Sequence, residues 1–172
     1  MNRLAVFANV YDTPYIHDWR KGIASQIDMD FEIVYYLHEE LNGALARILD
    51  DYDNLLFLDI DDIPQPALIS TAKQYMDYDV VGFGMRMFGD REGVFGFRKA
   101  PIKYNVYGFG NTMYSVDAIE HLMPLTTDYD TAQRAFYDGF AFEFVDLPLI
   151  HYRQYGQNDN IIEVEGGRAW RI

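Results

Sequence analysis

The feature that most constrains the fold is an alternation of apolar, β-prone runs with helix-like runs along the first half of the chain. The apolar runs typical of strands lie at 4–10, 31–37, 54–60 and 79–88. The stretches between them carry apolar residues at helical spacing and lie at 12–27, 42–52 and 65–76. This order predicts an open α/β sheet whose strands run mostly parallel. Ligands bind beyond the carboxyl ends of such strands, so residues just past each run are candidates for a site.

Residues typical of helix ends support this division. Asp12 or Thr13 is placed to cap the first helix, and Pro66 suits the start of the third. Further along, Ser115 is placed to cap another helix, and Gly139 follows the last residue of one more.

The second half of the sequence is less regular. Residues 89–114 are rich in glycine and aromatic residues, which predicts short antiparallel strands and loops. Helices are predicted at 115–123 and 128–139, and a strand at 140–152. The tail beyond 152 is predicted to be loop with one last strand. No linker or repeat interrupts the sequence, so residues 1–172 are predicted to form a single domain.

The overall composition narrows the classes of partner and compartment. A formal net charge of -13 argues against sequence-independent binding to nucleic acid, which requires basic surface. The chain has no cysteine, no signal-type leader and no apolar stretch approaching about 18 residues. We therefore expect a cytoplasmic protein without a membrane span or a nucleic-acid partner.

An acidic cluster closes the third apolar run, which reads "LLFLDIDDI" at 55–63. Asp59, Asp61 and Asp62 repel one another unless something neutralises them, and Mg²⁺ or Mn²⁺ prefers such oxygen ligands. If the strand continued, Asp59 and Asp61 would project to one side and Asp62 to the other. The alternative is a solvated turn after a strand, with Asp62 as a simple cap. The cluster alone leaves both interpretations open.

One family resemblance concerns this cluster. An apolar strand ending in Asp-x-Asp resembles the nucleophile motif of haloacid-dehalogenase-like phosphatases, which would make Asp59 a nucleophile. Ile63 stands where that family has Thr or Val, and two strand–helix units precede the motif instead of following it.

A second resemblance covers much more of the chain and is to the GT-A-fold glycosyltransferases, especially family 2. Six segments resemble that family's motifs in the correct order: "NVYD" (9–12), "ASQI" (24–27), "LDIDD" (58–62), "YGFGNTMYSVDAIEHL" (107–122), "TDYDTAQR" (127–134) and "YRQYGQN" (152–158). The resemblance implies a three-layer α/β/α fold with a mixed, mostly parallel central sheet. It also implies a nucleotide-sugar-binding half at 1–88 and an acceptor-side half at 89–172.

The resemblance also assigns residues to the nucleotide-sugar donor. The end of the first strand would hold the nucleotide through Asn9, Tyr11 and Asp12. Asp59 and Asp61 would bind Mn²⁺ or Mg²⁺, and Asp59 would also lie at the diphosphate. Two residues late in the chain would lie near the diphosphate as well: Arg153 and Gln154.

The implied reaction is transfer of a hexose-type sugar from a nucleotide-diphosphate sugar, with a UDP-sugar favoured, to a hydroxyl of a saccharide or glycolipid. Asp128 would act as the general base of an inverting displacement. The alternative for Asp128 is an acid that is favoured at a helix N-terminus by the helix dipole.

The sequence departs from that family in ways that bear on activity. Leu37–Glu40 ("LHEE") replaces a segment that usually carries an acid for the nucleoside, and Tyr155 replaces a histidine. The chain is also short for a complete enzyme of this family. A catalytically inactive, nucleotide-binding relic of the fold is therefore a third hypothesis, beside the transferase and the phosphatase.

Overall fold

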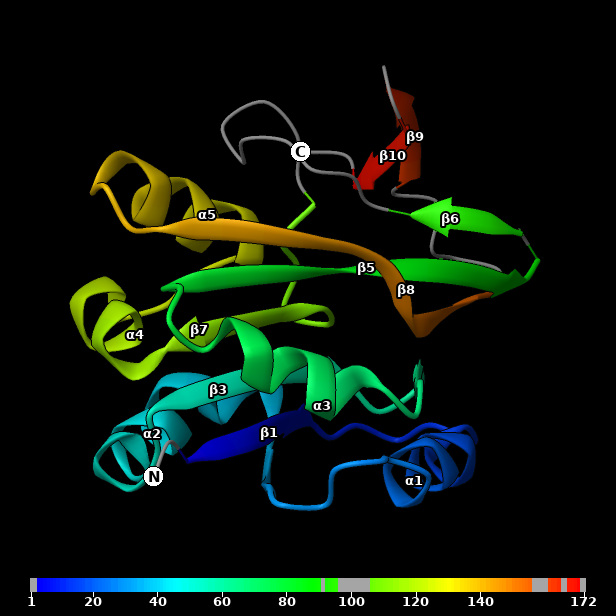
Figure 1. Cartoon of the computed structure of the whole chain (residues 1–172), viewed down its shortest axis with the longest axis horizontal. Coiled ribbons are helices and arrows are strands. Elements are labelled where there is room, and N and C mark those ends of the chain that lie inside the picture. Colours follow the sequence, from blue (N-terminus) through cyan, green and yellow to red (C-terminus); the bar gives the residue numbers. More distant parts are fainter. Residues whose placement is uncertain (1–2, 91, 96–105, 156–160, 165–166, 171–172) are drawn as a thin grey trace.

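The computed structural model describes residues 3–90, 92–95, 106–155, 161–164 and 167–170. Its centre is one mixed sheet with the strand order β2-β1-β3-β7-β5-β8-β4, and β6 pairs with β5 (Figure 1). The strands of this sheet are β1 (Leu4–Asn9), β2 (Glu32–Tyr36), β3 (Asn54–Asp59), β4 (Ile63–Pro64), β5 (Val80–Gly89), β6 (Gly93–Phe95), β7 (Thr112–Ser115) and β8 (Phe142–Gln154). A separate antiparallel pair consists of β9 (Ile161–Val164) and β10 (Gly167–Trp170).

The strand directions confirm a mixed sheet. Strand β1 runs parallel to β2 and β3, and β5 runs parallel to β8. Strand β7 lies between these two groups and is antiparallel to both β3 and β5. The short strand β4 is antiparallel to β8, and the short strand β6 is antiparallel to β5. Because β7 runs antiparallel to β3, the loop before β7 lies at the sheet edge where β3 ends.

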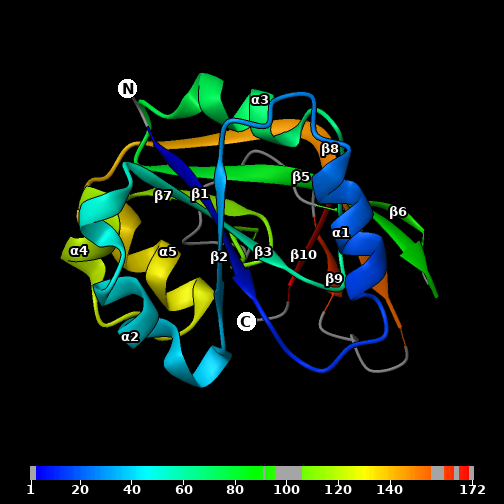
Figure 2. The ribbon, with the colours of Figure 1, turned by 90° about the horizontal axis from the view of Figure 1, so that it is seen from below.

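Helices cover both faces of the sheet and give three layers (Figures 1 and 2). On one face, α1 (Ile16–Ala24) and α3 (Leu68–Ala72) pack in a core with Leu56 and Leu58 of β3. On the other face, α2 (Leu41–Ala46), α4 (Val116–Leu122) and α5 (Asp128–Tyr137) pack in a core with Leu55 and Phe57. These alternating residues of β3 are completely or almost completely buried, as the two-residue period of a strand covered on both faces requires.

The predicted helices and strands are confirmed with shifted boundaries. The helix predicted at 12–27 begins at Ile16, because 13–15 form a turn in which Thr13 Oγ1 accepts from the Tyr15 N–H at 3.3 Å. The cap expected at Asp12 or Thr13 is therefore wrong, since Tyr15 is the N-cap. The predicted helices at 42–52 and 65–76 each break into an α-helix and a 3₁₀ turn, η2 (Leu49–Asp51) and η3 (Lys73–Tyr75).

The second half also follows the prediction in outline. Ser115 caps α4 by accepting from the Ala118 N–H at 3.2 Å, and Gly139 follows α5 with a φ of +87°. Strand β8 extends to Gln154, beyond the predicted end at 152. The pair β9–β10 replaces the single last strand that was expected, and part of the predicted 89–114 region lies outside the described residues.

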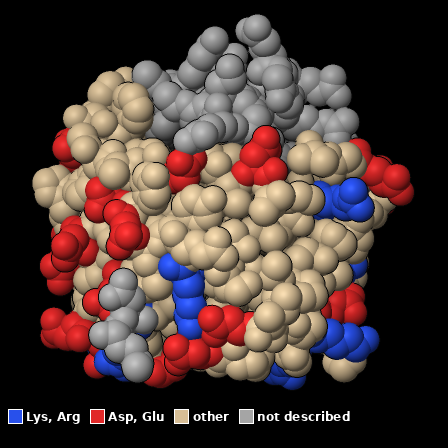
Figure 3. Space-filling model, in the orientation of Figure 1, with Lys and Arg blue, Asp and Glu red and all other residues tan. Residues whose placement is uncertain are grey.

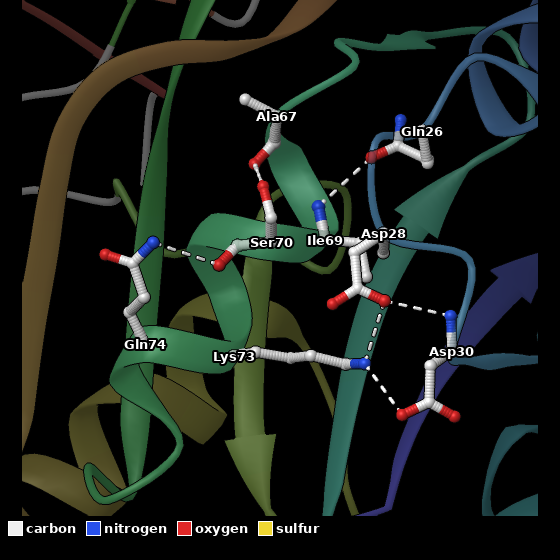
Figure 4. Close-up of polar contacts among 8 residues, drawn as sticks. All are labelled: Gln26, Asp28, Asp30, Ala67, Ile69, Ser70, Lys73 and Gln74. Atoms are coloured by element: carbon white, nitrogen blue, oxygen red, sulfur yellow. Dashed lines mark hydrogen bonds and ion pairs between the residues drawn. The ribbon is translucent and has the colours of Figure 1, made fainter.

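Gln26 fastens the connection after α1 to α3 (Figure 4). Its Nε2 donates to the carbonyl oxygens of Gly22 and Gln65 at 3.0 and 2.8 Å, and its Oε1 accepts from the Ile69 N–H at 3.1 Å. Gln26 is 5% exposed, so these bonds satisfy polar groups that water does not reach. Nearby, Lys73 Nζ pairs with Asp28 and Asp30 at 3.0 and 3.1 Å.

The surface reflects the acidic composition. On the face shown in Figure 3, acidic side chains are spread over much of the described surface and basic side chains are fewer. Among the described residues, each helix is too short or too polar to span a lipid bilayer.

We predict that Gln26→Leu lowers the free energy of unfolding by about 1–3 kcal/mol, because it leaves the buried Ile69 N–H without the side-chain oxygen that accepts from it. The Gln65 carbonyl keeps its bond from the Leu68 N–H at 2.9 Å. Urea denaturation followed by circular dichroism measures this change. Gln74→Leu is the matched control, since Gln74 is an exposed glutamine of the same region with one bond to Ser70 O. The control should change stability by less than about 0.5 kcal/mol, and equal losses in both variants would contradict the assignment.

Candidate functional site

The candidate site begins where three parallel strands end together. Asn9, Tyr36 and Asp59 are the last residues of β1, β2 and β3, and the register places Asn9 beside both of the others. Asn9 Nδ2 donates to Asp59 Oδ1 at 3.4 Å. This row of polar ends lies at the edge of the sheet where open α/β sheets bind ligands.

A cavity of about 440 Å³ covers this edge. The strand ends contribute Asn9, Tyr36 and Asp59 to its wall, and Asp62 lies there as well. Further parts of the wall come from His38, from Met85 and Tyr152 of β5 and β8, from the loop 108–110, and from the segment 126–128 at the start of α5. The volume is in the range of small-molecule sites.

The acidic residues lie in a turn, here called the acidic turn (59–62). Strand β3 ends at Asp59, the Asp62 N–H approaches the Asp59 carbonyl at 3.4 Å, and β4 begins at Ile63. The strand alternation therefore stops at Asp59, because residues 60–62 form a turn. Asp59 and Asp62 line the cavity, while Asp61 Oδ2 accepts from the Tyr155 O–H at 3.0 Å.

Gly110 packs directly against these two carboxylates. A Cβ at Gly110 would lie 2.8 Å from Asp59 Oδ2 and 3.8 Å from Asp62 Oδ2. Asn111 holds this loop in place, because its Oδ1 accepts from the Gly108 N–H and its Nδ2 donates to the Phe83 and Val106 carbonyls. The absence of a side chain at Gly110 thus leaves room for the Asp59 carboxylate.

Burial and the charges of neighbouring carboxylates raise the pKa values of Asp59 and Asp62. The pKa of Asp59 rises to about 6, mainly through burial and then through the charge of Asp61, with a further increase from Asp128. The hydrogen bond from Asn9 acts in the opposite direction. Burial and the charges of Asp61 and Asp59 also hold the pKa of Asp62 well above its usual range. A bound cation would relieve this repulsion.

The donor set fits a divalent cation that is completed by substrate. Among the residues described, no group of three or more His, Asp and Glu side chains is arranged to hold a metal ion alone. Two carboxylates on a cavity wall suit Mg²⁺ or Mn²⁺, which usually keep water and take phosphate oxygens as further ligands. Asp59 and Asp62 are the two acids of the turn that lie on the wall. Metal roles for Asp59 and Asp61 stay predictions.

Asp128, the predicted base, also lies on the cavity wall. Thr127 is the N-cap of α5, since its Oγ1 accepts from the Asp130 N–H at 3.1 Å, so Asp128 does not serve as the cap. Asp128 Oδ1 accepts from the Tyr129 N–H at 2.7 Å. Before it, the Asn42 side chain of α2 donates to the Leu125 carbonyl and accepts from the Leu125 N–H, at 2.9 and 2.7 Å. This pair of bonds fixes the segment that leads to Asp128.

The other predicted donor residues lie around the cavity rather than on the wall formed by the described residues. Tyr11 and Asp12 are exposed in the connection after β1, and Gln154 is 3% exposed in β8. Arg153 contacts the acidic turn itself. Their roles toward a nucleotide stay predictions.

Sequence reasoning missed several residues of the wall. Tyr36 directly precedes the "LHEE" departure and His38 lies within it. Gly110 belongs to the motif at 107–122, to which no site residue was assigned. Asp62 was noted in the cluster but assigned to the opposite side of a strand. The turn after Asp59 could not be read from the alternating pattern.

Comparisons with known proteins bear on this arrangement. No protein-family model matches the chain, and no curated protein matches it in sequence. Among solved structures, residues 1–349 of S. aureus TarS in complex with UDP-GlcNAc resemble this chain with a TM-score of 0.67 and 13% identity, over 91% of this chain and 59% of that chain. The mannosyltransferase PcManGT from Pyrobaculum calidifontis, in complex with GDP-Man and Mn²⁺, gives 0.61 and 14%, over 87% and 56%.

A third solved structure is close to this chain in length. A197 from STIV is similar with a TM-score of 0.53 and 18% identity, over 100% of this chain and 95% of A197. The chain thus spans about three fifths of the TarS 1–349 structure but nearly the whole of A197. At these identities the likeness concerns the fold.

The fold is that of the GT-A-type glycosyltransferases, as the sequence resemblance predicted. The phosphatase hypothesis rested on the acidic cluster alone, and the comparisons give it no support.

We predict that Asp59→Asn stabilises the metal-free protein at neutral pH. The pKa of Asp59 is raised from 3.8 to about 6 in the folded state, so its ionisation opposes folding above pH 6. The penalty disappears below about pH 4, where the group is protonated in both states. Asp59→Asn should therefore raise the free energy of unfolding by about 1–3 kcal/mol at pH 7.5, and this gain should vanish near pH 4.

Denaturant titrations at both pH values, with metal chelated, provide the measurement. Asp51→Asn is the control, because Asp51 is an exposed aspartate of the connection before β3. A gain that is the same at both pH values would show that the charge of Asp59 is not its cause.

Proposed function

We propose that the protein is a metal-dependent glycosyltransferase that moves a sugar from a nucleotide-diphosphate sugar to an acceptor hydroxyl. The observation that carries the proposal is the cavity at the ends of β1, β2 and β3, which joins Asp59 and Asp62 with Asp128 in one space. The GT-A fold supports the same class of reaction.

The donor would lie across the strand ends with its diphosphate toward the acidic turn. Asp59 and Asp62 would hold Mn²⁺ or Mg²⁺, which stabilises the negative charge that develops on a diphosphate leaving group. Tyr36 and His38 line the cavity near the end of β2, where the nucleoside would lie. A UDP-sugar is favoured by the family resemblance, and TarS is seen with UDP-GlcNAc and PcManGT with GDP-Man.

Asp128 would act as general base toward the acceptor. It would take the proton of the acceptor hydroxyl as that oxygen bonds to the anomeric carbon and the bond to the diphosphate oxygen breaks. A single displacement of this kind inverts the anomeric centre. Asp128 lies at the N-terminus of α5, where the helix dipole stabilises the ionised carboxylate that a general base requires before the reaction begins. The acceptor would be a saccharide or glycolipid, and we propose action in the cytoplasm.

Two departures favour a nucleotide-binding relic as the second candidate. Leu37, which replaces an acid of the family, is 43% exposed. The Asp61 carboxylate, which the family would use for metal, accepts a hydrogen bond from Tyr155. Binding of UDP without turnover of any UDP-, GDP- or dTDP-sugar would identify the relic.

We predict that the protein binds UDP more tightly with Mn²⁺ than without it, as measured by calorimetry. Asp59→Asn and Asp62→Asn should each weaken the Mn²⁺-dependent binding by about tenfold or more, because each removes a charged oxygen ligand. Asp51→Asn serves again as the exposed control. If Asp61→Asn weakens binding as strongly and Asp62→Asn does not, the metal pair is Asp59 with Asp61. If UDP affinity depends neither on Mn²⁺ nor on any of the three substitutions, the proposed donor site is wrong.

We predict that Asp128→Asn lowers the turnover number for sugar transfer by about 10²–10⁴-fold while UDP affinity stays near that of the native protein. Asp130→Asn is the matched control, since Asp130 is an exposed aspartate in the same helical turn. Transfer to a hydroxyl acceptor is followed with a labelled UDP-sugar. A variant at Asp128 that keeps its turnover would exclude this residue as the base.

A further inference from the structure

Arg153 lies where the acidic turn meets strand β8. Its backbone N–H donates to Asp62 Oδ1 at 2.8 Å, and its side-chain Nε donates to the Asp61 carbonyl at 3.0 Å. Just before it, β8 pairs with β4 through Ile63 and His151. One residue therefore holds the turn through both its main chain and its side chain.

The guanidinium group is fixed from several directions. Its central carbon lies 3.9 Å from the centre of the Tyr15 ring and 4.6 Å from that of Phe88. One terminal nitrogen forms an ion pair with Asp18 Oδ2 at 2.9 Å, and the side chain is 13% exposed. A planar, always-charged group suits such stacking and directed donation, which an ammonium group does not reproduce.

The contact to Asp62 has a direct effect on the cavity. Because Oδ1 of Asp62 accepts from the Arg153 N–H, the second oxygen is the one that lies toward Gly110 and the cavity. The bond from Nε to the Asp61 carbonyl fixes the neighbouring peptide. The main chain of Arg153 thus orients the Asp62 carboxylate, and its side chain holds the peptide that leads to Asp62.

We propose that Arg153 is a positioning residue, which holds the acidic turn so that Asp59 and Asp62 present oxygens to a divalent cation, and that it is not a ligand of the diphosphate. This inference rests on the proposed function. Positioning would take the place of the diphosphate contact that the family resemblance gives to Arg153. Asp18, Tyr15 and Phe88 would then support the site by holding the guanidinium group in place.

The test uses Mn²⁺ alone as its first probe, measured by electron paramagnetic resonance without nucleotide. Arg153→Lys keeps the charge but loses the planar group, and Asp18→Asn weakens the anchor without touching the turn. Arg3→Lys is the matched control. Arg3 also stacks on a ring, that of Tyr52, and pairs with an acid, Glu32, but it lies at the opposite end of β1.

We expect Arg153→Lys to weaken Mn²⁺ binding by about tenfold or more, the size typical for residues that orient metal ligands. Asp18→Asn should give a smaller loss in the same direction, and Arg3→Lys none. If Arg153→Lys binds Mn²⁺ normally and loses affinity only for UDP, Arg153 is a diphosphate ligand and the proposal is wrong. If Arg153→Lys does not fold, Asp18→Asn decides, because normal Mn²⁺ binding in that variant overturns the proposal.

A second measurement separates this proposal from the proposed function. Backbone amide resonances are compared in the metal-free protein by two-dimensional NMR. Shifts at residues 59–63 and Gly110 in Arg153→Lys and Asp18→Asn, with none there in Arg3→Lys, support positioning even if the native protein binds neither Mn²⁺ nor UDP. Unchanged resonances at these residues in both variants overturn it.

Discussion

Repulsion among three carboxylates in one buried turn is the constraint on which the rest of the site depends. Asp61 and Asp62 are 6% and 2% exposed, so water screens their charges poorly. The fold supplies a different hydrogen-bond donor to each acid: the amide of Asn9 to Asp59, the phenol of Tyr155 to Asp61, and the main chain of Arg153 to Asp62. These donors come from distant parts of the sequence, so the turn exists in this form only in the completed fold.

The antiparallel strand β7 brings the remaining wall to the acids. Its first residue, Thr112, pairs with Phe57 near the carboxyl end of β3, so the loop before β7 reaches the same edge as Asp59. A parallel strand at this position would carry that loop to the opposite edge. The mixed sheet is thus the reason that Gly110 can lie against Asp59 and Asp62.

The fold could be predicted to a large extent, because its signals are local. The alternation of runs defined β1, β2, β3 and β5 with their helices, and Ser115 marked its helix correctly. The candidate site was accessible in part, since Asn9, Asp59 and Asp128 lie on one cavity as the ordered motifs implied. That Asp62 lines this cavity could not be predicted from the sequence. It depends on a turn after Asp59 and on bonds to β8, about ninety residues later in the chain.

The bonds between Asn42 and Leu125 have a consequence for how the two ends of the cavity move. Asn42 lies in the helix that follows His38, and Leu125 leads into the segment that carries Asp128. The amide side chain of Asn42 bonds to both the N–H and the carbonyl of Leu125, as a paired strand residue would. These two bonds join the two segments outside the cavity. We therefore expect a displacement near His38 to be coupled to the segment that carries Asp128.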